Sequence, residues 1–424
     1  MKQYVLMMLL LSMLVSMGAA RWIYFKVLRV AKEKHLVDNP DARKLQKSPV
    51  PVVGGLVVFF GLMSGLLTSS AITNVFAAEL SEFPLGISVS DMLPVVLGMS
   101  VMLYIGCLDD VLGLSPRSRL IVEILVVLGM MVSTGVCVDT LHGLWGIGHL
   151  SIWISMPLTV FACVGIINAV NMMDGVNGLS SGICISCSLL CGIHFIYSQD
   201  WSNALLAFCM AASLLLFFIH NVFGNTSRMF IGDAGTMVLG LLMAWFVTSI
   251  MHNGDFRYVR GYGVCPTAMV VALFSVPVAD TLRVMTMRVA RGCSPFSPDK
   301  THLHHAFVAL GISHSVTTLS ELFIGLTVTG LWLVSLLLGA SLEWQFYVVV
   351  LAAAVLVWGT YFLLVHMQMS DSACGHRLRS FSASTHFAGR EWWQRFSLYL
   401  DAPEFTESER RNLKEKLRRK FSNY

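Results

Sequence analysis

Apolar runs of about 20 residues recur along this chain of 424 residues and limit the folds that it can adopt. A helix of that length crosses the hydrocarbon core of a bilayer. Only 13% of the residues are charged, whereas a soluble domain carries roughly 25%. We therefore expect an all-α polytopic membrane protein with about 11 transmembrane helices. These lie near residues 4–25, 51–72, 92–108, 119–138, 151–168, 179–198, 203–219, 236–252, 265–282, 321–340 and 345–367.

Lysine and arginine are unevenly distributed between the loops. When successive loops are assigned to alternate sides, all but three of the 29 Lys and Arg residues share a side with the C-terminus. The exceptions are Lys2, Arg257 and Arg260. Basic loops stay in the cytoplasm, so we expect the N-terminus outside and the C-terminus in the cytoplasm. Residues 139–150 are too rich in glycine and polar side chains to span, and we expect an outer loop or hairpin there.

A basic tail, residues 368–424, follows the transmembrane domain that we assign to residues 1–367. Thr406 and Glu409 have the spacing of a capping box and predict a helix that extends to about residue 421. Aromatic side chains stand beside arginines earlier in the tail, which is typical of a helix on the membrane surface. A solvated basic helix is the alternative. The residues concerned are Arg390, Trp392, Trp393, Arg395 and Phe396.

Four polar stretches interrupt the apolar runs, and all four fall on the expected cytoplasmic side. Unpaired polar groups in hydrocarbon cost several kcal/mol each, so such stretches belong to surface loops or to a polar site. None of them was used to set the orientation, and their common side favours one site. The stretches are Asp109 with Asp110, residues 168–178 with Asn168, Asn171, Asp174 and Asn177, Gly232 with Asp233, and His302 with His304 and His305.

The carboxylates point to a site that holds a cation. A charge at membrane depth costs about 2.5–3.5 kcal/mol, and the neighbours Asp109 and Asp110 would repel unless a cation or water shares their site. A metal-linked pair or a proton-accepting base fits, and an exposed loop pair is the alternative. Asp233 opens a helix between glycines, which let a ligand approach the backbone. Asp280 and Arg283 stand one helical turn apart, and we expect them to form a structural pair.

Two cytoplasmic loops offer groups that bind phosphate. The first loop contains Arg43 and Lys44, which anchor the topology and are candidates for holding phosphate. The second contains His302, His304 and His305. Zinc is one candidate ligand, but no cysteine or acid stands at the spacing of a known zinc site, so phosphate or sugar contacts are favoured. A surface cluster without a role is the alternative. Oxygen ligands beside phosphate favour Mg²⁺.

These stretches form five motifs in a fixed order: residues 40–55, Asp109 with Asp110, residues 168–178, residues 232–235, and residues 294–305. Because it has these five motifs in this order, the chain resembles the bacterial polyprenyl-phosphate N-acetylhexosamine-1-phosphate transferases of glycosyltransferase family 4. It is most similar to the initiating undecaprenyl-phosphate GlcNAc-1-phosphate transferases of enterobacterial common antigen, O-antigen and teichoic acid synthesis. The resemblance runs from about residue 38 to residue 345.

The resemblance implies transfer of N-acetylhexosamine-1-phosphate, with GlcNAc-1-phosphate favoured, from a UDP-sugar to undecaprenyl phosphate, with release of UMP. It implies Mg²⁺, or Mn²⁺ in its place, and an active site on the cytoplasmic face of the inner membrane. The partners are then the UDP-N-acetyl sugar, undecaprenyl phosphate and membrane lipids, with no nucleic acid. A homodimer is a candidate assembly.

The resemblance also implies roles for single residues. Asp109, Asp110 and Asp233 would be catalytic, with Asp109 a base for the lipid phosphate. Direct in-line displacement and a covalent aspartyl intermediate both remain open. Asn171 and Asp233 would hold the metal. The residues that bind substrate would be Arg43, Lys44, Asp174, Asn177, His302, His304 and His305.

Asn177 and Gln46 depart from the family pattern, because many relatives have Asp and His there. An amide can both donate to and accept from uracil, so Asn177 suits a nucleotide contact better than a metal ligand. The alternatives are a phospho-N-acetylmuramoyl-pentapeptide transferase of the same family and a proton-coupled secondary transporter. Transporters usually show internal repeats, and none is visible in this chain.

Overall fold

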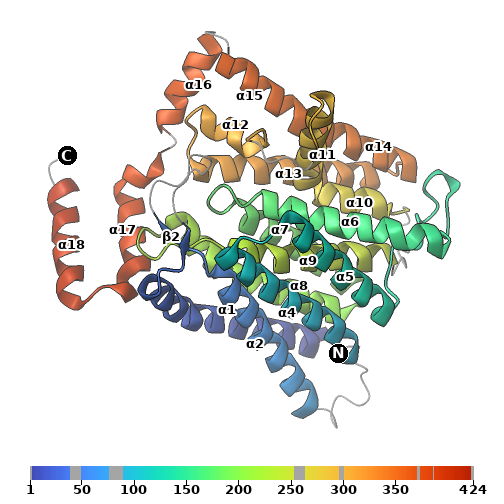
Figure 1. Ribbon diagram of the computed structural model, residues 1–424, viewed down its shortest axis with the longest axis horizontal. Coiled ribbons are helices and arrows are strands. Elements are labelled where there is room, and N and C mark those ends of the chain that lie inside the picture. Colours follow the sequence, from blue (N-terminus) through green and yellow to red (C-terminus); the bar gives the residue numbers. More distant parts are fainter. Residues whose placement is uncertain are drawn as a thin grey trace.

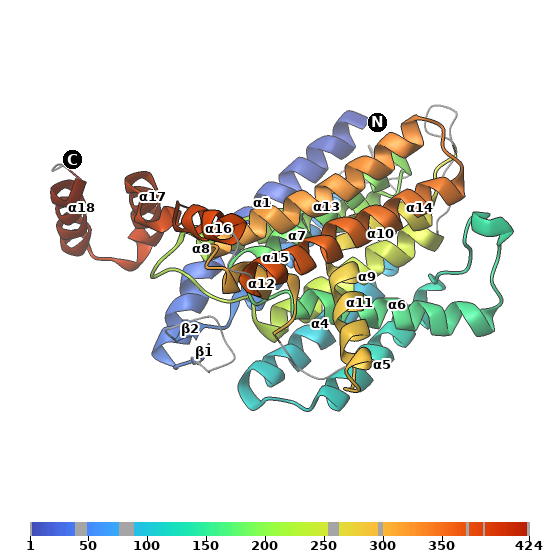
Figure 2. The same ribbon diagram turned by 90° about the horizontal axis from the view of Figure 1, so that it is seen from above.

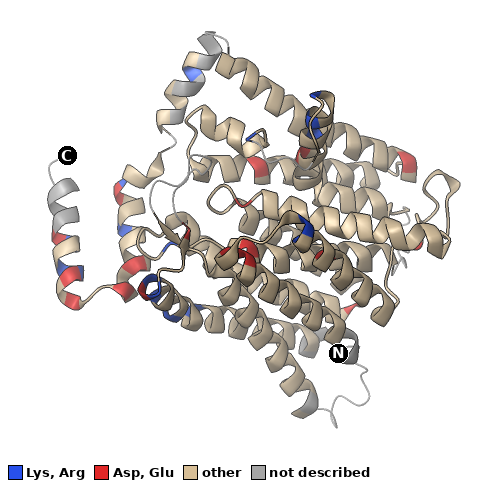
Figure 3. Cartoon of the chain, in the orientation of Figure 1, with Lys and Arg blue, Asp and Glu red and all other residues tan. Residues whose placement is uncertain are grey.

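The computed structural model describes residues 2–38, 49–75, 89–252, 263–295, 300–369, 373–384 and 386–421. Helices make up most of this part of the chain (Figure 1). Within it, nine helical segments are long and apolar enough to cross a membrane, and a bent pair makes a tenth. Charged residues are sparse along these helices (Figure 3). The prediction of an all-α polytopic membrane protein is confirmed in this form.

The elements follow the order of the expected spans. The first part contains α1 (Lys2–Glu33), β1 (Val37–Asp38), β2 (Val50–Pro51), α2 (Gly54–Val75), α4 (Val89–Leu112), α5 (Pro116–Thr134), α6 (Ile152–Met172), α7 (Leu179–Tyr197), α8 (Trp201–Phe223) and α9 (Gly232–His252). The second part contains α10 (Pro266–Leu273), α11 (Ser275–Ala290), α12 (Leu303–Ala309), α13 (His314–Leu337), α14 (Leu342–Ala353), α15 (Thr360–Met369), α16 (Ala373–Ser384), α17 (Glu391–Asp401) and α18 (Glu407–Phe421). A π-helical turn, residues 354–359, joins α14 to α15 in one continuous span.

Two of the expected spans differ from the others. The helix α5 takes the place expected near 119–138, but Arg117, Arg119 and Glu123 lie within its 19 residues, and it is not among the nine helices that are apolar enough to span. The segment expected as one span near 265–282 is instead bent by 78° between α10 and α11. Pro277 explains the break, because it has no N–H to donate to the carbonyl of Leu273. The expectation of an unbroken span is wrong at this place.

The helix α9 occupies the centre of the bundle, and nearly all of its residues are buried. It packs on α2, α4, α6, α7 and α10. Glycines allow the closest approaches: a Cβ on Gly55 would lie 2.3 Å from the nitrogen of Gly235, and one on Gly106 would lie 2.3 Å from Cα of Ala234. The start of α9 is therefore fixed between α2 and α4, which brings Asp233 close to the end of α4.

The end of the first loop also lies against the start of α9. The strands β1 and β2 pair antiparallel, with Val37 opposite Pro51. The backbone of Phe230 donates to the carbonyl of Pro51 at 2.8 Å, and Gly54 donates to the carbonyl of Phe230 at 2.9 Å. Main-chain hydrogen bonds thus join the first motif to the residues directly before the fourth.

The segment 139–150 is a hairpin, as expected, closed by an antiparallel bridge between Thr140 and His149. The tail continues through α17 to α18, which lies outside the bundle beside α17 (Figures 1 and 2). Thr406 and Glu409 form the predicted capping box, with hydrogen bonds of 2.8 Å from the Thr406 nitrogen and 3.4 Å from the Glu409 nitrogen.

The aromatic part of the tail contacts protein. The ring of Trp393 lies 4.5 Å from that of Phe223 at the end of α8, and Phe396 lies 5.2 Å from the same ring. Trp393 is buried, whereas Trp392 is more than half exposed. Because one face of α17 docks on α8, neither a membrane-surface helix nor a solvated helix describes the whole of α17. The periodicity of the sequence did not indicate this docking.

Candidate active site

Asp110 closes the start of α9. Its carboxylate accepts hydrogen bonds from the backbone nitrogens of Asp233 at 2.8 Å and Ala234 at 3.1 Å. Gly232 has a φ of +73°, and a Cβ at this position would lie 2.6 Å from Asp110 Oδ2. Only glycine therefore lets Asp110 reach the helix terminus, where a negative charge is stabilised. Asp110 fixes the position from which the Asp233 side chain extends.

Arg119 bridges the other two carboxylates. Its Nη1 lies 2.7 Å from Asp109 Oδ2 and 3.3 Å from Asp233 Oδ1. Asp109 also accepts from the Leu114 nitrogen at 2.6 Å, which ties it to the turn between α4 and α5. Arg119 was missed from the sequence. The signal was present, because Arg119 lies in the first turn of α5, the helix that directly follows the paired aspartates.

Asn171 joins the same cluster from the end of α6. Its Nδ2 donates to Asp233 Oδ1 at 2.6 Å and to Thr236 Oγ1 at 2.7 Å. One turn earlier, Asn168 donates to Glu123 Oε2 at 2.5 Å. Glu123 is a second residue that sequence reasoning missed, since it had been assigned to the interior of an apolar span. Asp109, Asp110, Asn171 and Asp233 are thus brought together as the sequence predicted.

Asp174 lies on the turn between α6 and α7, outside the spanning helices. It accepts a hydrogen bond from Ser180 Oγ at 2.7 Å. Burial, reinforced by the negative charges of Asp233 and Asp110, raises the pKa of Asp174 to about 7, although the Ser180 hydrogen bond opposes the shift. A carboxyl group with this pKa can donate or accept a hydrogen bond near neutral pH.

The histidine motif is anchored by Asp280. Its carboxylate accepts from Arg283 Nη2 at 2.6 Å and from the Leu303 nitrogen at 3.2 Å, and it hydrogen-bonds His302 Nδ1 at 2.8 Å. The expected structural pair of Asp280 and Arg283 is present. It does more than the spacing indicated, because it fixes His302 and the start of α12.

His304 lies against the turn that carries Asp174. A Cβ on Gly175 would lie 2.9 Å from His304 Nε2, and the ring of His304 lies 4.4 Å from that of His305. Burial, together with the positive potential of His305 and His302, lowers the pKa of His304 to about 3. His304 is therefore neutral at pH 7, so it can hydrogen-bond a sugar or a phosphate but brings no charge to either.

Two groups of predicted residues lie elsewhere. Asn177 is held at the start of α13, where its carbonyl accepts from Thr318 at 2.9 Å and its nitrogen lies 3.4 Å from His314 Nδ1. It is not joined to the acidic cluster by any contact that we describe in this part of the chain. Arg43 and Lys44 lie outside the described residues.

The cluster around Asp233 has the donor chemistry of a hard cation site. Its donors are carboxylate and amide oxygens, and the Asp233 side chain is 32% exposed. Such ligands suit Mg²⁺. Within the described ranges, Asp109, Asp110 and Asp233 do not bring three ligand atoms within 4.8 Å of one another. A cation would therefore share Asp233 with Arg119 or displace the guanidinium.

Comparison with known proteins places this geometry in a family. Residues 92–251, which carry Asp109, Asp110, Asn171 and Asp233, match the model of glycosyl transferase family 4. A relative from Yersinia pestis, an undecaprenyl-phosphate alpha-N-acetylglucosaminyl 1-phosphate transferase, is 30% identical over 295 residues, which cover 68% of this chain and 74% of the relative. A protein of the same name from Escherichia coli K12 is 28% identical, covering 68% and 73% of the two chains. A probable undecaprenyl-phosphate N-acetylglucosaminyl 1-phosphate transferase from Bacillus subtilis is 27% identical, covering 70% and 77%. By its sequence, and with its acidic residues gathered at the ends of α4, α6 and α9, the chain belongs to glycosyl transferase family 4.

Proposed function

We propose that the protein transfers GlcNAc-1-phosphate from UDP-GlcNAc to undecaprenyl phosphate and releases UMP. The names of the relatives support the acceptor and the transferred group. The observation that carries the proposal is the cluster of Asp109, Asp110, Asn171, Asp233 and Arg119 at adjoining helix ends. A set of carboxylates with one guanidinium suits phosphoryl transfer, in which positioning and charge stabilisation dominate.

Asp233 and Asn171 are the residues that would hold Mg²⁺. When bound, the ion neutralises charge that develops on the pyrophosphate of the donor. Asp110 does not compete for this role, because both of its oxygens accept from the backbone at the start of α9. It acts as a positioning residue that sets the direction of the Asp233 side chain.

Arg119 is the group that responds to a phosphate ligand. In this structure its guanidinium neutralises Asp109 and Asp233. A pyrophosphate with its cation brings both the positive charge that the carboxylates need and the oxygens that a guanidinium binds in bidentate fashion. Arg119 then turns from the carboxylates to the phosphate, which couples binding of the donor to release of the acids.

Asp109 is the candidate contact to the lipid phosphate. A phosphate monoester has a second pKa near 6 and is mostly dianionic at pH 7, so it needs little help from a base. Asp109 would then orient the attacking oxygen, and the covalent aspartyl route remains the alternative. Asp174, Asn177 and the histidine motif complete the donor side, with neutral His304 suited to a sugar hydroxyl.

The site would face the cytoplasm at the inner membrane, because basic loops flank it. One substrate then arrives from the lipid and the other from solution. The lipid-linked sugar that results would initiate a cell-envelope glycan such as O-antigen or a teichoic acid linkage.

The test is transfer by the purified full-length protein in detergent. With Mg²⁺, undecaprenyl phosphate and UDP-[³H]GlcNAc we expect labelled lipid and UMP in equal amounts. Omission of the lipid is the control for simple hydrolysis. A folded preparation that labels no lipid with any UDP-N-acetyl sugar would overturn the proposal. Labelling only from UDP-N-acetylmuramoyl-pentapeptide would instead favour the second transferase of the family.

A further inference from the structure

A second cluster of ligand-type side chains lies at the opposite end of α9. Cys137 and Asp139 follow α5, and His252 is the last residue of α9. The helix has 21 residues, so at 1.5 Å per residue its two ends are about 30 Å apart. This cluster is therefore separate from the site around Asp233.

The three side chains converge on one point. Cys137 Sγ, a carboxylate oxygen of Asp139 and a ring nitrogen of His252 all lie within 4.8 Å of one another. Among the described residues, this is the one group of three or more His, Cys, Asp or Glu side chains whose ligand atoms lie this close together. His252 Nδ1 lies 3.4 Å from Asp139 Oδ1, and neither buried atom has a hydrogen-bond partner in the described part of the chain.

Backbone hydrogen bonds hold the segments that carry these three side chains in place without a bound ligand. The Asp139 nitrogen donates to the Cys137 carbonyl at 3.0 Å, and the Val138 nitrogen donates to Thr159 Oγ1 at 2.9 Å, which fixes a tight turn. The neighbouring His142 Nε2 lies 2.7 Å from the carbonyl of Met251. The turn and the end of α9 are thus linked independently of the cluster, so a ligand would not have to order them.

An ion pair between His252 and Asp139 is the simpler explanation, but it accounts for only part of the arrangement. The contact between His252 and Asp139 lacks hydrogen-bond geometry. It also does not explain why Cys137 Sγ, which accepts a hydrogen bond from Ser155 at 3.2 Å, lies within 4.8 Å of both. A cation bound by all three would satisfy both buried orphan atoms.

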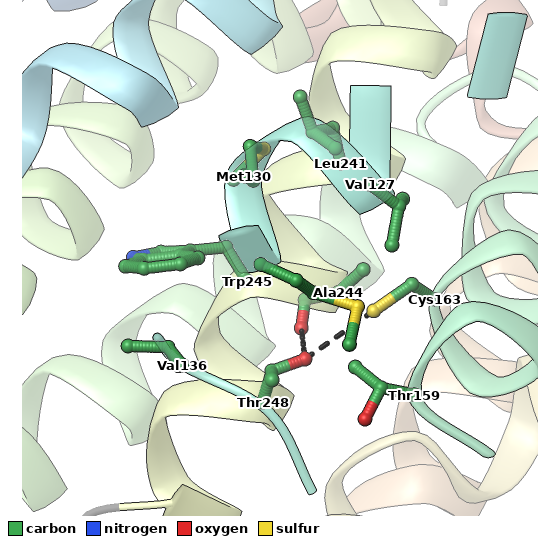
Figure 4. Close-up of a pocket in the computed structure, with 10 residues that line it drawn as sticks. Val127, Met130, Val136, Thr159, Cys163, Leu241, Ala244, Trp245 and Thr248 are labelled. Carbon is green, nitrogen blue, oxygen red and sulfur yellow. Dashed lines mark hydrogen bonds between the residues drawn. The ribbon is translucent and has the colours of Figure 1, made fainter. Parts of the chain in front are cut away.

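Chain neighbours of the cluster line a mostly apolar pocket. Val136 and Thr248, close to Cys137 and His252 in the chain, line this small pocket together with Met130, Cys163 and Trp245 (Figure 4). Thr248 is hydrogen-bonded to Cys163 at 3.3 Å. A low-dielectric environment strengthens the attraction between a cation and its ligands.

We propose that Cys137, Asp139 and His252 form a binding site for Zn²⁺ or a chemically similar transition-metal ion. A thiolate, an imidazole and a carboxylate are ligands of Zn²⁺ and do not suit Mg²⁺. Binding releases the Cys137 thiol proton to solvent and leaves a fourth position of a tetrahedral ion for water. The ion clamps the hairpin at 139–150 to the end of α9, and the site is independent of the proposed transferase activity.

The test uses Co²⁺ as a spectroscopic probe. The full-length protein is purified with a tag that contains no histidine, and a chelator removes any bound metal beforehand. We expect a sulfur-to-cobalt charge-transfer band that saturates at one thiolate-bound Co²⁺ per chain and is lost when Zn²⁺ displaces the ion. The histidines at 302–305 can bind Co²⁺ but contribute no thiolate band. Zn²⁺ should also raise the thermal unfolding midpoint, because it binds only the folded state.

Cys137→Ser should abolish the band, and His252→Gln should weaken Co²⁺ binding about 100-fold or more, since loss even of outer-shell partners costs 10–100-fold. Cys163→Ser is the matched control, because Cys163 lies on the neighbouring helix outside the three-ligand group, and it should keep the band. Absence of the band in the wild type would overturn the proposal. So would a band that survives in Cys137→Ser or an unchanged affinity in His252→Gln.

Discussion

Asp233, in the first turn of α9, and Asp280, inside α11, are both acids on helices of the bundle, yet their surroundings differ. Asp280 is 4% exposed and accepts hydrogen bonds from Arg283, His302 and the Leu303 backbone. Asp233 is one-third exposed and is held by Asn171 and Arg119. The partners of Asp280 are buried and complete its coordination. Those of Asp233 are two side chains that are themselves partly exposed.

The difference separates an anchor from a site. Arg283 is buried and also donates to the carbonyl of Thr301 at 2.5 Å, and its guanidinium lies 3.5 Å from the ring centre of Tyr361. Removing Asp280 would take away the carboxylate that is hydrogen-bonded to this buried cation. Removing the charge of Asp233 relieves its repulsion with Asp109 and leaves Arg119 paired. The first residue should therefore matter for folding and the second for chemistry.

The largest effect on stability is expected from Asp280→Asn. Breaking a buried ion pair on one side costs about 3–5 kcal/mol, because the remaining charge stays buried. The thermal unfolding midpoint of the purified protein should fall by several degrees, and the histidine motif should lose its position. The double variant Asp280→Asn with Arg283→Met should recover part of the loss. If the single variant melts like the wild type, Asp280 is not the anchor that its contacts indicate.

Asp233→Asn should affect activity and leave folding intact. We expect transfer to fall about 100- to 1000-fold, the size found when one charge-stabilising group is lost from an active site. The unfolding midpoint should match that of the wild type, since Asn171 and Arg119 both remain hydrogen-bonded. Labelled lipid per minute and thermal unfolding of the same preparation measure the two quantities. A variant that unfolds early but turns over normally would reverse the comparison with Asp280.

Arg119 tests whether the partners of Asp233 are replaceable. Arg119→Ala removes charge-assisted hydrogen bonds worth about 1.5–3 kcal/mol each, so activity should fall about 10- to 100-fold. Arg119→Lys keeps the charge but loses the fork that binds phosphate, and it should recover only part of the activity. The neighbouring Arg117→Ala serves as the control and should be close to the wild type. Full activity of Arg119→Ala would remove Arg119 from the donor site.

The sequence predicted the acids but not the cation between them. Asp109, Asp110, Asn171 and Asp233 were found because each is a polar residue beside an apolar run, where polarity has a cost that must be explained. Arg119 and Glu123 were hidden inside a segment read as a span, and a basic residue at a helix start has an ordinary explanation as a topology signal. Their roles depend on distances between α5, α6 and α9, which no local pattern contains.

The fold shows the same limit. Spans were predictable from length and hydropathy, because the bilayer sets both. The 78° break between α10 and α11 was not, although Pro277 marked it, since a proline near a helix start is also tolerated. The docking of α17 on Phe223 required the partner surface, and the tail alone could not reveal it.

The pH dependence of the free energy of unfolding should distinguish Asp174 from Asp233 and Asp280. Its pKa is raised from 3.8 to about 7 by burial, so the folded protein binds more protons than the unfolded chain between these values. The contribution of Asp174 to stability is then fully present below pH 3.8 and is lost as the pH rises towards about 7. Asp174→Asn does not ionise, so its unfolding midpoint relative to that of the wild type should rise across this window. A constant difference would mean that Asp174 titrates normally in the folded protein.

The smallest effect is expected at Asp401, which is saturated like Asp280 but by neutral groups. It accepts from the backbone nitrogens of Thr226 at 3.2 Å and Ser227 at 3.0 Å, and from Ser227 Oγ at 2.5 Å. The cation that it influences, Arg228, is only partly buried and can be hydrated. Asp401→Asn keeps an acceptor oxygen and should cost about 1–2 kcal/mol, the worth of a backbone cap.

The control for Asp401 is Glu391→Gln, which breaks an exposed pair with Arg395 on the same helix and should change stability by about 0.5 kcal/mol or less. Thermal unfolding of the two variants beside Asp280→Asn ranks the three acids. If Asp401→Asn were as damaging as Asp280→Asn, complete hydrogen bonding would be enough to make an anchor. If it lies near the control, what makes Asp280 an anchor is the buried charge of Arg283.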